Sequence, residues 1–378
     1  VPGQTNLGRK DNSYFNIVQY TVDFGGTAEF ELTPTITSKT SAGVQYFRNI
    51  ISGTDAWGID IVNGAKSIGA SAENFSDEFT TEDKTLGTFI EQQFGINDNL
   101  FVTGAIRADD NSAFGRDFDA VIYPKLSLSW LLSEEDYFPE IGFLDQFRIR
   151  GAWGKSGLQP GSDDAIRTLA AEAITNPDDE TISGVSSGSV GNTLLEPEKS
   201  SEIELGFDAD MFDGRVGLDV TYYDKNTTDA LVNAPLAPSL GASTSRWVNI
   251  GEVNNKGWEA AINATLMDTD AVAWDATVSG SINDNELIDL GGNPPIGSQT
   301  RFIEDYPLGG QWGRPINSFN DANGNGIIEP DELVVADELE YIGPGLPTQE
   351  ASFTSSVTLF DRVRLYGLLD YKGDYYSY

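Results

Sequence analysis

The chain contains no cysteine and no histidine among its 378 residues. Without cysteine it can form neither a disulfide nor a thiolate metal site. Without histidine it lacks the base of Ser–His–Asp and Cys–His catalysis, together with every imidazole metal ligand. An enzyme built from this sequence would have to use carboxylates, lysine, tyrosine or a Ser–Lys pair, so many common mechanisms are excluded.

Long apolar runs are also missing. No stretch of about 18 apolar residues occurs, so we expect no transmembrane helix, and hydrophobic residues make up only 39% of the chain. A membrane β-barrel remains compatible with this composition, because only every second residue of a spanning strand faces lipid. The first ten residues show no signal peptide, and no lipidation motif is visible.

Basic residues are scarce: 23 Lys and Arg stand against 59 Asp and Glu, giving a net charge of −36. Such a chain repels nucleic acid, so we expect no nucleic-acid partner. Two explanations of the acidity stay open. The carboxylates attract cations or polar solutes to a lumen or its loops, or they are the general adaptation of an exposed protein to a salty habitat.

Alternation of apolar and polar residues with a period of two dominates the sequence and predicts strands. Between residues 202 and 211, Ile203, Leu205 and Phe207 alternate with four acidic residues and Gly206, and similar runs occupy 147–153, 216–223, 258–266, 272–279 and 362–370. Several runs reach about ten residues, the length that a tilted strand needs to cross a bilayer. We therefore expect about twelve strands.

The links between these runs differ in length. Short links are predicted at 97–99, 213–214, 268–271 and 361, and long ones at 52–83, 157–199, 227–245 and 285–349. From Leu86 onward short and long links largely alternate, which in an up-and-down barrel puts all short turns at one rim. A soluble β-sandwich also alternates residues, but gives no reason for sorting its loops. The best helix signal, 163–173, lies inside a long link.

Aromatic residues gather near the expected strand ends, as at Tyr222 and Tyr223. This placement is typical of the aromatic girdle of a membrane barrel. Ordinary β-propensity of aromatic residues is the alternative explanation.

Five stretches then resemble one family, the SusC/RagA group of TonB-dependent outer-membrane receptors. They follow the family's order across most of 91–378: EQQFGINDNLFVTGAIRADDNSAFG (91–115), YPKLSLSWLLSEEDYF (123–138), FRIRGAWGKSGLQPG (147–161), LEPEKSSEIELGFDADMFDGRVGLDVTYYDKNTTDAL (195–231) and NIGEVNNKGWEAAIN (249–263).

The resemblance implies an all-β fold, an antiparallel transmembrane β-barrel with long external loops and short periplasmic turns. Residues 1–378 would be part of a barrel of about 22 strands, with the plug domain and the final strands not present. It also implies a location in the outer membrane of a Gram-negative, Bacteroidota-like bacterium. The protein would import oligosaccharides or oligopeptides and would not be an enzyme. The implied partners are the TonB–ExbB–ExbD complex, a SusD-like surface lipoprotein, a glycan or peptide ligand, and outer-membrane lipid.

Other functions stay open beside this one. The same barrel serves receptors for siderophores or vitamins, and a secreted β-rich surface adhesin would show similar strands. Carboxylates on the polar strand faces invite comparison with a glycosidase, although they serve equally well as solvated charges lining a lumen. Arg148 and Arg150 are expected to pair with carboxylates across the lumen, and the carboxylates in question are Glu202, Glu204, Asp208, Asp210 and Asp219.

One loop predicts a metal site. Residues 321–332, DANGNGIIEPDE, fit the calcium-loop pattern D-x-[DN]-x-[DN]-G-x5-E. The predicted ligands are side-chain oxygens and one carbonyl, from Asp321, Asn323, Asn325, Ile327 (backbone), Glu329 (directly or through water) and Glu332. Pro330 stiffens the exit and no flanking helices are evident, so a metal-free acidic turn is the alternative. Ca²⁺, the only cofactor expected, would order this external loop.

Overall fold

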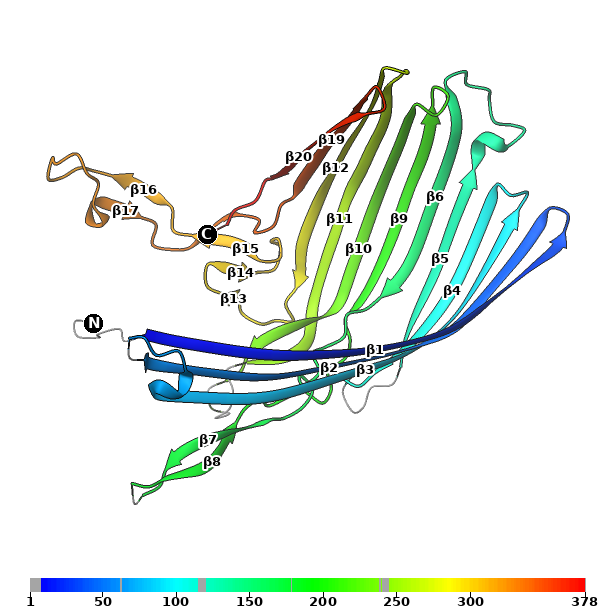
Figure 1. Ribbon diagram of the computed structural model, residues 1–378. Helices are drawn as coiled ribbons and strands as arrows, with labels where there is room; N and C mark the ends of the chain where they lie inside the picture. Colours follow the sequence, from blue (N-terminus) through cyan, green and yellow to red (C-terminus); the bar gives the residue numbers. More distant parts are fainter. Residues whose placement is uncertain are drawn as a thin grey trace.

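The computed structural model describes residues 8–61, 63–114, 120–177, 179–237, 239 and 245–377. A twelve-stranded antiparallel sheet dominates it (Figure 1). The strands of this sheet lie side by side in their order along the chain, with β6 pairing with β9 and β12 with β19 across long connections. The predicted all-β antiparallel fold is therefore confirmed. The strands of the sheet are β1 (Gly8–Thr33), β2 (Ile36–Ile61), β3 (Ser71–Ile96), β4 (Leu100–Asn111), β5 (Val121–Leu131), β6 (Leu144–Ser156), β9 (Lys199–Met211), β10 (Val216–Pro235), β11 (Ser245–Asp268), β12 (Val272–Asp289), β19 (Gln349–Leu359) and β20 (Val363–Gly373).

The remaining elements are insertions in two long connections. The β6–β9 connection holds the hairpin β7 (Leu169–Thr175) and β8 (Thr181–Ser187). The β12–β19 connection holds β13 (Ile296–Gly297), β14 (Thr300–Phe302), β15 (Gly310–Gly313) and β18 (Glu340–Gly343), and also the pair β16 (Ile316–Phe319) and β17 (Leu333–Val335). Short 3₁₀ turns occur at η1 (Ile68–Ala70), η2 (Leu132–Glu134) and η4 (Pro330–Glu332). No helix in the described residues is long and apolar enough to cross a membrane.

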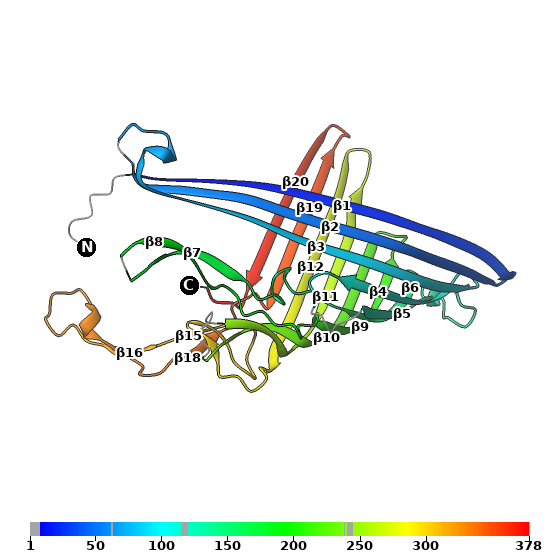
Figure 2. The same ribbon diagram turned by 90° about the horizontal axis from the view of Figure 1, so that it is seen from below.

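Figures 1 and 2 show the sheet as a curved wall in which β1–β3 run in a direction very different from β9–β12. Tight turns join strands at one end of this wall. Asn97 and Asp98 have positive φ between β3 and β4, as do Asp213 and Gly214 between β9 and β10. Residues in this backbone region match the right-handed twist of a hairpin. The long insertions leave from the other end, so the predicted sorting of short and long links holds in the structure.

Three predictions made from the sequence are wrong in detail. Residues 52–83 are not a link, because β2 continues to Ile61 and β3 already begins at Ser71. Residues 163–173 form no helix, because a turn at 162–165 is followed by strand β7 from Leu169. The link expected at 227–245 is shorter than predicted, because β10 continues to Pro235. Strands β2 and β3 extend beyond the region of alternating residues. In this outer part neither face of the sheet needs to be apolar, so the strands pair without a period-two pattern in the sequence.

The register gives the sheet one apolar face. In one row of directly paired residues, successive strands contribute Phe30, Ser38, Phe94, Val102, Leu128, Gly151, Leu205, Tyr222, Trp258, Ile282, Gln349 and Gly373. Many large side chains on this face are exposed, including Leu205, Ile262 and Leu369. A continuous exposed apolar surface of this kind requires an apolar environment. We call it the lipid face.

Aromatic residues mark both margins of the lipid face. Tyr222 and Trp258 lie with ring centroids 5.0 Å apart, next to a charged row in which Lys256 forms an ion pair with Asp284 at 3.3 Å. Toward the tight turns, the Trp130 indole N–H donates to Glu135 at 2.9 Å. Phe143 and Phe212 stack nearby with centroids 5.8 Å apart. Amphipathic rings at two levels are the expected arrangement at two membrane–water interfaces.

The apolar band between these margins has the height of a membrane core. On β12 it runs from Trp274 to Ile282, which at about 3.3 Å per residue is roughly 26 Å along the strand. Strand tilt shortens this height somewhat.

Buried side chains are few in the wall and concentrate at its outer end, where the long connections meet it. Asn249 of β11 holds the β6–β9 connection there: its amide nitrogen donates to the carbonyls of Glu196 at 2.7 Å and Asp229 at 2.9 Å. Its Oδ1 accepts the Glu196 N–H at 2.8 Å. Leu195 beside this clasp is fully buried. The conspicuous Leu195–Lys199 and Asn249–Gly251 sequences thus serve to anchor a long loop.

Candidate functional site

The opposite face of the sheet is polar, and we call it the polar face. The row adjacent to the apolar one consists of Glu31, Thr37, Gly95, Phe101, Ser129, Arg150, Gly206, Thr221, Glu259, Ser281, Glu350 and Lys372. A shift of one residue along any strand exchanges the two faces. Because these two rows run across all twelve strands, alternation in the sequence becomes a wall that is apolar on one side and hydrophilic on the other.

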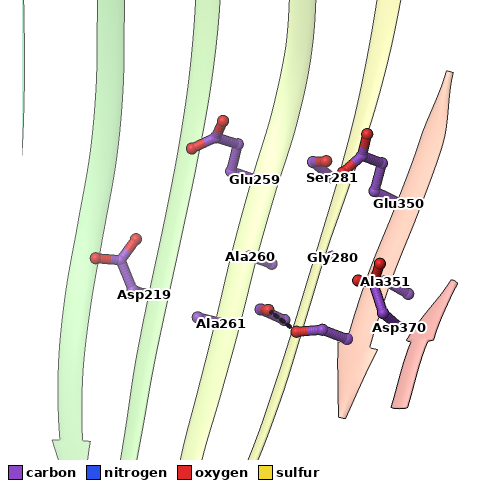
Figure 3. Close-up of a pocket in the computed structure, with 11 residues that line it drawn as sticks. Asp219, Glu259, Ala260, Ala261, Gly280, Ser281, Glu350, Ala351 and Asp370 are labelled. Atoms are coloured by element: carbon purple, nitrogen blue, oxygen red, sulfur yellow. Dashed lines mark hydrogen bonds between the residues drawn. The ribbon is translucent and has the colours of Figure 1, made fainter. Parts of the chain in front are cut away.

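Four carboxylates surround a shallow depression of about 320 Å³ on the polar face. Figure 3 shows Asp219, Glu259, Glu350 and Asp370 projecting from separate strands around Ala261 and Gly280. The floor is low because the register places small residues between the acidic ones, and a hydrogen bond of 2.7 Å joins Ser279 and Ser352 across it.

Arg148 and Arg150 both form ion pairs with carboxylates of this face. Arg148 Nε lies 2.7 Å from Asp208 Oδ2 on the neighbouring strand β9. Arg150 Nη2 lies 2.5 Å from Asp219 Oδ1 on β10 and donates to Thr221 Oγ1 at 2.7 Å. The predicted pairing therefore occurs between strands that lie one or two positions apart in one wall, and not across the lumen. The reason is reach: an arginine side chain spans one or two strand spacings of about 4.8 Å.

The charge of the depression is only partly neutralised. Asp219 pairs with Arg150, and Glu350 pairs with Lys372 at 3.3 Å. Within the described part of the chain, Glu259 and Asp370 have no ion-pair partner. A water-facing wall with unpaired carboxylates favours polar or cationic solutes over anions.

Sequence reasoning singled out Glu202, Glu204, Asp208, Asp210 and Asp219 as one set. The structure places all five on the polar face, on β9 and β10. The sequence pattern does not single out Glu350 and Asp370, which complete the depression from β19 and β20. The alternation of residues 349–359 is enough to predict strand β19. No local sequence pattern, however, predicts that β19 pairs with β12 across the long insertion.

The 321–332 loop lies between β16 and β17. The Asp321 carboxylate accepts the N–H groups of Asn325 at 3.1 Å and Gly326 at 2.9 Å. The Glu332 carboxylate accepts the N–H groups of Ala322 at 2.9 Å and Glu329 at 3.1 Å. Gly324 and Gly326 have positive φ, as the sharp turn requires. The loop thus turns its carboxylates inward, toward its own backbone.

These contacts neither confirm nor contradict the calcium hypothesis. In the described residues, no group of three or more Asp and Glu side chains gathers closely enough to hold a metal ion. The predicted ligand set contains two amides and a backbone carbonyl besides carboxylates, and hard cations accept all three oxygen types. Asp321, Asn323, Asn325, Ile327, Glu329 and Glu332 remain the residues predicted to hold Ca²⁺.

The pKa of the Glu332 carboxyl group is lowered, chiefly by the hydrogen bond from the Glu329 N–H. Burial opposes this shift, and the N–H groups of Asn323 and Ala322 add to it. Each of these hydrogen bonds stabilises the ionised form. Glu332 therefore holds the loop together as a carboxylate.

Comparison with known proteins gives consistent matches along the whole chain. Residues 1–375 match the family model described as TonB dependent receptor-like, beta-barrel. TonB-dependent receptor P26 of Formosa agariphila is 29% identical over 274 residues, which is 64% of this chain and 28% of that protein. TonB-dependent receptor SusC of Bacteroides thetaiotaomicron is 25% identical over 289 residues, covering 68% of this chain and 28% of SusC.

Solved structures show the same fold. The RagAB peptide transporter superposes with a TM-score of 0.81 at 16% identity, over 96% of this chain and 42% of the matched chain. The siderophore receptor PiuA of Acinetobacter baumannii superposes with a TM-score of 0.56 at 11% identity, over 95% of this chain and 46% of PiuA. The chain therefore spans less than half the length of each of these relatives.

Proposed function

The chain belongs to the TonB-dependent receptor β-barrel family, in its SusC/RagA group, and from this premise we propose that it forms part of the wall of an outer-membrane active importer. The resemblance carried by five sequence stretches is confirmed. The proposal rests on two adjacent rows of paired residues across the sheet, one apolar and the other polar. One row meets lipid and the other lines a hydrophilic passage.

The whole barrel is larger than the described sheet in this proposal. Strands β1 and β20 are the two edges of the sheet, and an open strand edge in a bilayer costs several kcal/mol for each unsatisfied backbone group. Further strands pairing with β1 and β20 would satisfy these groups. We place residues 1–378 within a barrel domain of about 22 strands, which encloses a plug domain belonging to the complete receptor.

The family supports a proposal for the energy source and the partner. Transport through such a barrel would be driven by the TonB–ExbB–ExbD complex acting on the plug. A SusD-like surface lipoprotein would cover the external mouth. The matched solved structure is named as a peptide transporter, and the relative SusC gives the group its name. We therefore propose oligopeptides or oligosaccharides as cargo, with the Gram-negative outer membrane as the location. Transport, and no catalytic step, is the function proposed for the polar face.

A receptor for ferric chelates or vitamins is the second candidate, because siderophore receptors share the barrel. Their structural agreement is weaker, with a TM-score of 0.56 for PiuA against 0.81 for the peptide transporter. A soluble adhesin has less support, since its exposed surface would have to include the whole lipid face.

Uptake in cells separates these candidates. The gene for the complete receptor is deleted and restored, and uptake of labelled oligopeptides, oligosaccharides and ferric chelates is measured. We expect deletion to abolish uptake of an oligopeptide or oligosaccharide, and a protonophore to abolish it in the restored strain. Loss of ferric-chelate uptake alone would favour the second candidate, and unchanged uptake of all three would refute import.

A further inference from the structure

The polar face changes character at its outer end. Lys225, Asn255 and Asn285 are directly paired on this face, and the next residues on the same face are Thr227, Val253 and Leu287. Val253 and Leu287 are buried, and together with Leu290 they form an apolar cluster. The wall thus becomes apolar where the hydrophilic passage meets the outside.

The β12–β19 connection folds back over this apolar region. Ile296 of β13 and Phe302 of β14 pack against the cluster, and Figure 1 shows β13–β15 beside the ends of β11 and β12 that lie far from the tight turns. Between the connection and the wall lies a cavity of about 540 Å³. Its apolar lining includes Leu231, Val232, Trp247, Leu308 and Leu346.

The size and lining of the cavity suit a ligand group without hydroxyls. A volume of about 540 Å³ lies inside the range of about 300–1,000 Å³ that is usual for small-molecule sites. Apolar walls cannot hydrogen-bond the hydroxyl groups of a sugar, and burying such groups unpaired is costly. An apolar side chain, in contrast, gains from leaving water there.

The polar groups around the cavity have different tasks. Glu198 Oε1 accepts the Leu231 N–H at 2.8 Å, and Asn285 Oδ1 accepts the Leu308 N–H at 2.6 Å. These two contacts hold the walls of the cavity together. Asn255 Oδ1 accepts from Asn285 at 2.7 Å, and among the described residues the side-chain N–H groups of Asn255 donate no hydrogen bond.

Lys225 is the charged group at the cavity that the fold leaves unused. It lines the cavity and is half-buried. Glu202 is its register partner on β9, yet within the described residues Lys225 forms neither an ion pair nor a hydrogen bond. The chain as a whole has a net charge of −36 and repels anions. The free ammonium group of Lys225 beside the apolar cavity can still bind a carboxylate through a charge-assisted hydrogen bond.

We propose that this cavity binds an apolar amino-acid side chain at the carboxyl end of a peptide ligand, with the terminal carboxylate against Lys225 and Asn255. The inference rests on the proposed import function and narrows its cargo to peptides. The peptide backbone would continue along the hydrophilic wall, which an alkyl chain of a fatty acid would not favour.

The test uses the intact receptor in detergent and titration calorimetry with three tetrapeptides: Gly-Gly-Leu-Leu, its C-terminal amide, and Gly-Gly-Ser-Ser. Burial of one leucine side chain predicts affinity for the leucine peptide about ten- to a hundredfold above that for the serine peptide. Leu308 lines the cavity and is 37% exposed. The Leu308→Trp variant should fill the cavity with the larger tryptophan side chain and remove the preference for the leucine peptide. Leu346→Trp, at a 70% exposed residue, is a second filling variant in case the first disturbs the fold.

Two further variants complete the design. Leu194→Trp makes the same exchange at a 69% exposed leucine outside the cavity and should leave binding unchanged. Lys225→Met should abolish the preference for free acid over amide while keeping the preference for leucine over serine. The proposal is overturned if both filling variants bind like Leu194→Trp, or if decanoate displaces the peptide more effectively than a second leucine peptide does.

Failure of this inference can be told apart from failure of the proposed function. Peptide uptake by cells that is unaffected in Leu308→Trp and Leu346→Trp would remove the cavity as a binding site and leave import intact. Calorimetric binding that follows the expected pattern, with no peptide uptake by cells, would remove import and leave the cavity.

Discussion

Arginine at position 278 should destabilise the protein in a membrane far more than arginine at position 277. Val278 lies on the lipid face of β12, midway between Trp274 and Ile282, and is 50% exposed. Thr277 lies one residue away, on the polar face, opposite Asn263. The two substitutions introduce the same charge at nearly the same depth, so their difference reports only which face meets lipid.

The expected magnitude follows from the depth of Val278. Arginine on the lipid side of a barrel costs about 2–4 kcal/mol at the bilayer midplane, which is roughly a 30- to 700-fold loss in the folding equilibrium. Thr277→Arg loses the hydrogen bond that Thr277 Oγ1 donates to Asn263 Oδ1 at 2.8 Å, worth about 1 kcal/mol. The new guanidinium stays in water beside an acidic wall, which offsets part of this loss.

The assay is urea-induced unfolding of the complete receptor in lipid vesicles, followed for the native chain and both variants. We expect the unfolding midpoint to fall clearly for Val278→Arg and little for Thr277→Arg. Equal destabilisation by both would contradict a sheet with one lipid face and one wet face. A larger effect of Thr277→Arg would mean that the two faces have been assigned the wrong way round.

Three further results are expected. Asn249→Ala removes the three hydrogen bonds that hold the β6–β9 connection and should lower the stability of that connection by roughly 3 kcal/mol. We expect faster proteolysis within 157–198 while the barrel stays folded. Unchanged proteolysis would exclude this role of Asn249. Calcium titration should show a site that Asp321→Ala abolishes, and equal affinity in both proteins would remove the proposed metal site. The folded state lowers the pKa of the Glu332 carboxyl group. Ionised Glu332 therefore stabilises the 321–332 loop at pH values above the ordinary carboxyl pKa, and this stabilisation is lost as the pH falls through the lowered pKa of the folded state. Hydrogen exchange of the Glu329 and Ala322 amides, corrected for intrinsic rates, should therefore rise at acid pH in the native chain, whereas Glu332→Gln should show no such pH dependence.

Much of the wall could be predicted because a membrane imposes a strict pattern on it. Wherever a strand crosses lipid, its parity must be kept, so Ile203, Leu205 and Phe207 predict their strand, its faces and its neighbours' faces. The tight turns were equally readable, since Asp213-Gly214 is a sequence that suits positive φ. Beyond the membrane this constraint ends, so the sequence predicts a link at 52–83 where the outer parts of β2 and β3 form strands.

The candidate site was less predictable, for a topological reason. Its acidic depression joins Asp219, Glu259, Glu350 and Asp370, and residues 290–348 separate the strands that carry the last two from β12. Nothing local in the sequence states that β19 resumes the sheet beside β12. The apolar cavity was missed for a related reason, since its roof folds back from that same connection.

A single parity rule therefore connects stability and function in this wall. The lipid face needs continuous apolar rows to remain in the membrane, and the same register then fixes a continuous hydrophilic row on the other side without any separate requirement. Function can vary only where that rule is relaxed: in small residues that open the depression at Ala261 and Ser279, and at the outer end, where Val253 and Leu287 turn the hydrophilic face apolar. If cargo selection resides in the wall, substitutions at these relaxed positions should alter it with little loss of stability. Substitutions within the lipid face should do the opposite.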